Sequence, residues 1–90
     1  MGNNNSRTML FTSEEIKREN LKQLLLSVEE ALTERGYNAV NQISGYLMSG
    51  DPAYISSHKN ARTNIQHVER FEIIEELVHA FVEYHHLEDK

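Results

Sequence analysis

Three side chains near the C-terminus are of the types that bind a metal ion. His79, Glu83 and His86 are spaced by four and three residues, so one helix face would present all of them. A metal site needs ligands that converge from several directions, and sites in helix bundles draw on more than one helix. No second segment of the chain offers such a set. We therefore predict no metal site and no cofactor, and interpret these residues as a solvent-exposed polar face.

The acidic residues of the same stretch do not indicate catalysis. Glu72, Glu75, Glu76 and Glu83 alternate with apolar residues, which is typical of the solvent side of an amphipathic helix. No Ser-His-Asp arrangement and no glycine-rich phosphate loop can be argued. The absence of cysteine excludes thiol nucleophiles, disulfides and thiolate zinc sites. The sequence predicts a protein that is not an enzyme.

The middle of the chain supports one alternative, a helix-turn-helix dimer that binds DNA. Residues 39–47 and 52–62 would be its two helices, and the second would carry Lys59 and Arg62 toward a groove. Lys59 and Arg62 are only two permanently charged side chains, which is few for a protein that contacts a phosphate backbone. The net charge of the chain is −5, and seven acids against two cations place that excess in residues 69–90. We therefore expect no nucleic-acid partner.

The hydroxyl groups near the N-terminus suggest that the protein is a substrate for phosphorylation. Residues 1–10 contain no acid and show no apolar periodicity, so we expect a flexible tail that a kinase could reach. Ser6 and Thr8 lie in this tail, and Arg7 precedes Thr8. A phosphate would add about −1.5 to −2 charges. Thr12 and Ser13 are poorer candidates because they stand at the predicted start of a helix.

Residues 11–90 are predicted to form a single helical domain that begins with a long helix over 13–35. Thr12 and Glu15 complete a capping box, and Phe11 with Ile16 stand at the positions of a hydrophobic staple. Leucines at spacings of three and four then follow along one face. Gly36 is expected to end the helix as a left-handed cap, with Tyr37 packing back on its last turn.

The segment 36–54 holds three of the four glycines and the only proline, and the rest of the chain is organised around it. Its signals predict an N-cap at Asn38, a helix end at Gly50, and a new turn with Asp51 as N-cap and Pro52 as first residue. The apolar face of the short helix would comprise Val40, Ile43, Tyr46 and Leu47. Tyr54 and Ile55 are expected to pack inward.

A third long pattern covers residues 59–86. It fits either one helix or two joined near 67–70, because no glycine or proline decides between them. Its apolar positions are Ala61, Ile65, Val68, Phe71, Ile74, Leu77, Val78, Phe81 and Val82. The fold class is therefore all-α, a small bundle of two long helices with one or two short central helices. Its apolar surface exceeds what 90 residues readily bury, so we predict a symmetric homodimer.

The chain resembles the IreB family of small bacterial regulatory phosphoproteins. The resemblance rests on TMLF at 8–11, GYNAVNQISGYLMSGDPAYI at 36–55, Ala61 with Arg62, Ile65, and Glu69 with Arg70 ahead of EIIEELV at 72–78. It implies a cytoplasmic, non-enzymatic, helical homodimer that is not inserted in a membrane. The core and interaction positions that it marks are Gly36, Tyr37, Asn38, Asn41, Gln42, Gly45, Tyr46, Gly50, Asp51, Pro52, Tyr54, Ala61 and Arg62.

The resemblance also implies a regulatory circuit. Its members are substrates of a membrane-anchored, eukaryotic-type Ser/Thr kinase with extracellular PASTA repeats, IreK-like, and of the opposing phosphatase. The circuit is linked to cell-wall stress and cephalosporin tolerance, and the downstream protein partner is unknown. Thr8 falls on one of the two modified threonines of the family. The other place is Asn5 here, so Ser6 is a possible substitute. A phosphate on Thr8 would fold back toward the start of the first helix, or toward Lys59 and Arg62.

Overall fold

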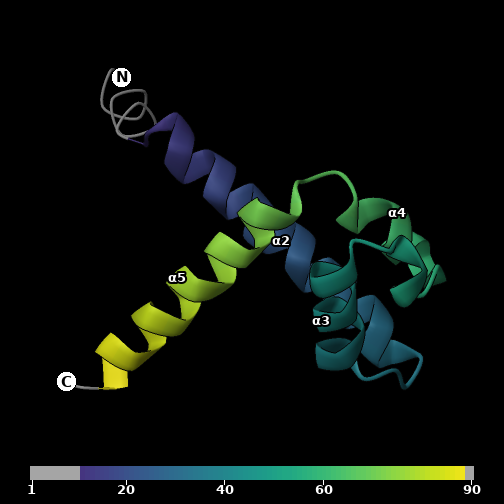
Figure 1. The fold of residues 1–90 in the computed structure, drawn as a ribbon. Helices are drawn as coiled ribbons and strands as arrows, with labels where there is room; N and C mark the ends of the chain where they lie inside the picture. Colours follow the sequence, from purple (N-terminus) through teal and green to yellow (C-terminus); the bar gives the residue numbers. More distant parts are fainter. Residues whose placement is uncertain (1–10, 89–90) are drawn as a thin grey trace.

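The structure is a computed structural model that describes residues 11–88, with the side chains of residues 11–86. Within this range the chain is all-α and contains no strand, as predicted (Figure 1). The two long helices are α2 and α5, and the two short ones are α3 and α4. Their bounds are Ser13–Glu34 for α2, Ala39–Ser49 for α3, Ala61–Ile65 for α4 and Arg70–Glu88 for α5, with single 3₁₀ turns η1 at Pro52–Tyr54 and η2 at His58–Asn60.

Both ends of α2 are set by the local signals that predict them. At its start, the Thr12 hydroxyl accepts a hydrogen bond from the Glu15 amide, and the Glu15 carboxylate accepts one from the Thr12 amide, both at 3.0 Å. At its end, Gly36 is left-handed with φ +81°. The amide of Tyr37 then donates to the Leu32 carbonyl at 3.0 Å, which completes a Schellman motif. Both predicted caps are confirmed.

The caps of the central segment are also confirmed, but two of its apolar residues are not where the pattern puts them. Asn38 and Asp51 accept hydrogen bonds from the amides of residues 41 and 53, and Gly50 is left-handed. Ile55 is fully buried. Val40, however, is 75% exposed because α3 turns Ala39, Ile43, Tyr46 and Leu47 toward the core, and Tyr54 is 51% exposed because its ring lies on the outside of α3.

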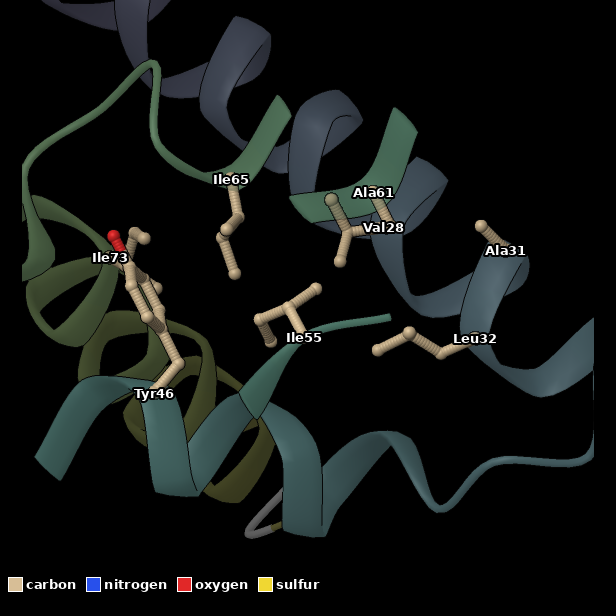
Figure 2. Packing of buried hydrophobic residues seen from close by; sticks show 8 residues of the cluster. All are labelled: Val28, Ala31, Leu32, Tyr46, Ile55, Ala61, Ile65 and Ile73. Atoms are coloured by element: carbon tan, nitrogen blue, oxygen red, sulfur yellow. The ribbon is translucent and has the colours of Figure 1, made fainter. Parts of the chain in front are cut away.

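The hydrophobic core lies between the second half of α2, α3, α4 and the start of α5 (Figure 2). In Figure 2 the side chains from these elements point toward one another, with Ile55 near the middle. The buried apolar residues are Val28, Ala31, Leu32, Tyr46, Ile55, Ala61, Ile65 and Ile73. The marked segment 36–55 therefore contributes a helix and a turn to a core that distant parts of the chain complete.

The third pattern forms two helices that are joined by a turn at 66–69. The amides of Gln66 and His67 bond to carbonyls three residues back, which ends α4, and α5 restarts at Arg70. Before α4, Lys59 and Asn60 both have positive φ. The turn lets α5 run away from the core at an angle to α2, so its C-terminal half extends outward (Figure 1).

The prediction that the acidic residues of α5 lie on its solvent side is wrong for Glu76. Six apolar residues of the third pattern are 42–69% exposed: Phe71, Ile74, Leu77, Val78, Phe81 and Val82. The buried positions are Ile73 and Glu76, and Glu76 belongs to the acidic face expected in solvent. The physical reason is that the first half of α2 presents cations to α5, so an acidic face packs there and the apolar stripe turns away.

Candidate functional site

Ion pairs join the first half of α2 to α5. Arg18 Nε lies 2.5 Å from Glu76 Oε1, and Arg18 Nη2 lies 2.9 Å from Glu83 Oε2. The second contact is an ion pair rather than an aligned hydrogen bond, since Nη2 has no hydrogen-bond partner. Lys17 Nζ contacts Glu72 Oε2 at 3.0 Å on the outside. These five residues form the α2–α5 ion-pair cluster.

The pKa values of Glu83 and Lys17 are shifted in the directions expected for opposite charges in contact. The Arg18 guanidinium lowers the pKa of Glu83, and the hydrogen bond with Glu72 raises the pKa of Lys17. Only Glu76 is well buried among the three acids. The cluster therefore holds α5 against α2 with charges that water and salt still reach.

A groove of about 690 Å³ lies beside this cluster. Its walls are residues 13–24 of α2, the 67–68 part of the turn, and residues 72–79 of α5. Leu21, Leu24 and Val68 give it apolar surface. The charged lining residues are four glutamates against Lys17 and Arg18, so with neutral histidines the lining carries a net charge of −2. We call this feature the α2–α5 groove.

The candidate phosphorylation sites Ser6 and Thr8 lie outside the described residues, as does the whole predicted tail 1–10. Covalent geometry nevertheless limits where they can act. Thr8 is four residues before Thr12, a reach of about 13 Å at roughly 3.3 Å per residue. Thr12 caps α2 next to the groove. Any group on Thr8 therefore stays within range of the first turns of α2.

The same limit removes one of the two phosphate destinations that the sequence left open. Lys59 contacts Glu34, at the C-terminal end of α2, at 3.0 Å. A helix of 22 residues is about 33 Å long at 1.5 Å per residue, more than twice the reach of Thr8. Arg62 lies in the same part of the molecule, where its Nε donates to the Ile55 carbonyl. In its own chain, a phosphate on Thr8 cannot reach these cations.

Most of the marked residues of the central segment have an evident structural role. The Gln42 side chain accepts a hydrogen bond from the Ser56 amide at 3.0 Å, which ties the chain after η1 to α3. Gly45 gives Tyr54 its place, because a Cβ there would lie 2.5 Å from the tyrosine ring. Tyr46 and Ala61 are buried in the core.

Four further marked positions set the turns of this region: Gly36, Asn38, Gly50 and Asp51 act as helix caps. Pro52 opens η1, as expected for a residue without an amide proton. Tyr37 and Asn41 are exposed. Sequence reasoning missed the α2–α5 ion-pair cluster. The available signal was the −5 charge of residues 69–90, which calls for cations elsewhere in the chain.

The cations required by the DNA-binding alternative are engaged within the protein. Lys59 pairs with Glu34, and Arg62 donates to a backbone carbonyl at 2.7 Å. Arg70 donates to the Leu47 carbonyl at 2.9 Å. Arg35 contacts His58 Nδ1 at 3.3 Å, while His58 Nε2 faces Glu34. Contacts with phosphates would have to replace these interactions, so the geometry does not favour DNA binding.

Among the three residues considered as metal ligands, His79, Glu83 and His86, Glu83 forms an ion pair instead. Glu83 faces Arg18 rather than a metal-ligand partner. Within residues 11–88, no group of three or more ligating side chains is placed to hold a metal ion. The same range contains no helix with the length and apolar character needed to cross a bilayer.

The protein is a small helical domain with capped helices, a hydrophobic core, the α2–α5 groove and an exposed apolar face on α5. Residues 6–83 match the model of the family described as IreB regulatory phosphoprotein, and the chain belongs to this family. A UPF0297 protein of Acetivibrio thermocellus is 48% identical over 79 residues, which cover 88% of each chain. A UPF0297 protein of Ruminiclostridium cellulolyticum is 44% identical over 83 residues, 92% of this chain and 94% of that one.

Membership in this family establishes a regulatory class for the chain. The match includes both Ser6 and Thr8, and it extends through the ion-pair cluster as far as Glu83. The family assignment, expected from the central segment, is confirmed.

Proposed function

We propose that this chain is a non-enzymatic, cytoplasmic regulatory protein whose state is set by phosphorylation of Thr8. Ser6 is the substitute site for the place occupied by Asn5. The family description as a regulatory phosphoprotein supports this proposal. Thr8 is four residues before the N-cap of α2, and the first turn of this helix lines a charged groove, which gives a phosphate something to act on.

The modifying enzyme in this proposal is a membrane-anchored Ser/Thr kinase of the IreK-like, PASTA-containing type, opposed by a phosphatase. The chain then acts on a downstream protein, and the circuit modulates the response to cell-wall stress and cephalosporin tolerance. Charge supports the choice of a protein partner over nucleic acid, because the cations of the central segment are engaged and residues 69–90 are acidic.

The observation that carries an interaction role is the uncovered stripe of α5. Phe71, Ile74, Val78 and Phe81 repeat at spacings of three, four and three, which is the seam pattern of a coiled coil. They lie on the side of α5 turned away from α2 and are 42–69% exposed. We propose that a second copy covers this stripe, because a two-fold axis lets a single helix face meet itself.

Mass spectrometry after treatment with the cognate kinase tests the proposal. Wild-type protein should gain phosphate in the peptide that contains Thr8, and Thr8→Ala should lose that signal. Ser6→Ala reports the substitute site separately. Thr12→Ala is the matched control, because its hydroxyl is engaged as a helix cap and its removal should leave the phosphate count unchanged. A phosphate count that Thr8→Ala does not change contradicts the proposal.

A further inference from the structure

We propose that the unmodified N-terminal segment of the same chain docks in the α2–α5 groove, and that a phosphate on Thr8 releases it. This inference rests on the proposed function and names its regulation. The occupant is the segment 1–10, which lies outside the described residues and joins the groove directly, since Ser13 and Glu14 are among the lining residues.

The length of the segment fits the groove. A chain that turns back at Thr12 covers about 13 Å by Thr8 at roughly 3.3 Å per residue. That distance corresponds to about nine residues along α2, at roughly 1.5 Å each, and so to the level of Leu21. Glu72 lies at the level of Lys17, which it contacts, well inside this range. Arg7 and Thr8 therefore reach the acidic part of the groove without strain.

Charge is complementary between the two parts. Arg7 is the only charged side chain in residues 1–10, so the bare segment carries +1. The groove lining carries −2. Opposite charges that face each other at a protein surface attract more strongly than they do in open water. The neighbours of Thr8 add apolar groups, Met9 and Leu10, that match the leucine surface of α2.

Phosphorylation reverses the sign of this attraction. A phosphate on Thr8 brings about −1.5 to −2 charges and makes the segment net negative. The two cations of the groove are already paired with glutamates, Lys17 with Glu72 and Arg18 with Glu76 and Glu83. Binding the phosphate would leave those acids unpaired. The modified segment is therefore repelled and becomes available to a partner.

The test uses a paramagnetic label and NMR on the full chain. Because the chain has no cysteine, Asn4→Cys provides a single attachment site for a nitroxide. In the bare protein, the amide signals of Leu21, Leu24 and Glu75 should lose most of their intensity, and that of Met48 on α3 should not. Stoichiometric phosphorylation of Thr8 should restore the groove signals, and added salt should restore them in part.

Substitutions separate docking from general structure. Arg7→Gln and Glu75→Gln should each weaken the broadening, because each removes one charge of the complementary set. The matched control is Glu30→Gln, which changes an exposed glutamate toward the other end of α2. Groove signals that keep full intensity in the bare protein overturn the proposal, and so does broadening that phosphorylation leaves unchanged.

A mixed sample identifies the chain that supplies the segment. Labelled chains without ¹⁵N are combined with unlabelled ¹⁵N chains, and broadening that arises only between chains overturns docking within one chain. Phosphate on Thr8 is counted in the same samples. If Thr8 takes up no phosphate, the proposed function fails while the bare-protein and Arg7→Gln spectra still decide docking. If Thr8 is modified and the broadened groove signals do not recover, the release by phosphate fails while the proposed phosphorylation stands.

Discussion

The two halves of α2 are held to the rest of the protein by different forces. The C-terminal half buries Val28, Ala31 and Leu32 in the core that α3 and α4 complete. The N-terminal half has no fully buried residue and meets α5 mainly through Lys17 and Arg18. Burial of apolar surface is insensitive to moderate salt and pH, whereas partly exposed ion pairs respond to both. One end of the helix therefore maintains the fold, and the other end is suited to change.

The largest effect is expected from the core. Ile65 is completely buried, so Ile65→Ala leaves a cavity and should lower the free energy of unfolding by about 2–5 kcal/mol. The control Val40→Ala removes a similar side chain that is 75% exposed and should change it by less than about 0.5 kcal/mol. Urea denaturation followed by circular dichroism measures both. Equal losses would mean that the two sites do not differ as described.

Glu76→Gln should have the next largest effect, because it leaves the half-buried Arg18 without its closest partner. The expected loss is about 1–3 kcal/mol, below the figure for a wholly buried pair because Arg18 is one third exposed. Glu75→Gln, at an exposed position in the same helical turn, is the control and should be close to neutral. A double-mutant cycle with Arg18→Met isolates the interaction, and a coupling energy near zero would remove the ion-pair cluster from the account.

Gly36→Val tests the left-handed cap between α2 and α3. No atom lies within 4 Å of a Cβ at this position, so the cost comes from backbone strain alone and should be about 1–2 kcal/mol. Gly36→Asn should cost less, because asparagine tolerates this conformation. Thermal unfolding compares the two. If valine and asparagine give the same melting temperature, the strain explanation is wrong.

The smallest effect concerns acid. The pKa of Glu83 is lowered by Arg18, and that of Glu34 by hydrogen bonds from His58 and then Lys59. A carboxylate with a lowered folded-state pKa stabilises the protein above its unfolded pKa, and this contribution is lost as pH falls through the folded value. Melting temperature should therefore decline below about pH 4.3, the ordinary value for glutamate. Glu83→Gln should flatten the decline, and an unchanged slope would argue against the Arg18 contact.

Sequence reasoning succeeded where structure is decided within a few residues. Thr12, Gly36, Asn38 and Gly50 mark helix ends through bonds to neighbouring backbone, so their residue types alone predict the caps. The family resemblance supplied what local chemistry cannot, namely the prediction that Thr8 is the modified residue. The predicted tail and both phosphorylation sites stay predictions, because they lie outside the described residues.

Sequence reasoning failed where partners from distant parts of the chain decide. Both sides of α5 show helical spacing, and the cations of α2, among them Arg18, 58 residues from Glu76, determine that the acidic side faces inward. The break between α4 and α5 has no glycine or proline to mark it. Tyr54 is half exposed because its ring packs on the surface of α3 at Gly45, and helical periodicity does not reveal this contact.

The most direct test of the proposed interaction role is the mass of the protein in solution. If the apolar stripe of α5 is covered by a second copy, sedimentation equilibrium at micromolar concentration should give twice 10.4 kDa, about 20.8 kDa. Phe81→Asp should shift the mass toward the monomer, and Met48→Asp, at an exposed position on α3, should leave the dimer intact. A wild-type mass of 10.4 kDa, or a dimer that Phe81→Asp does not weaken, would contradict the account.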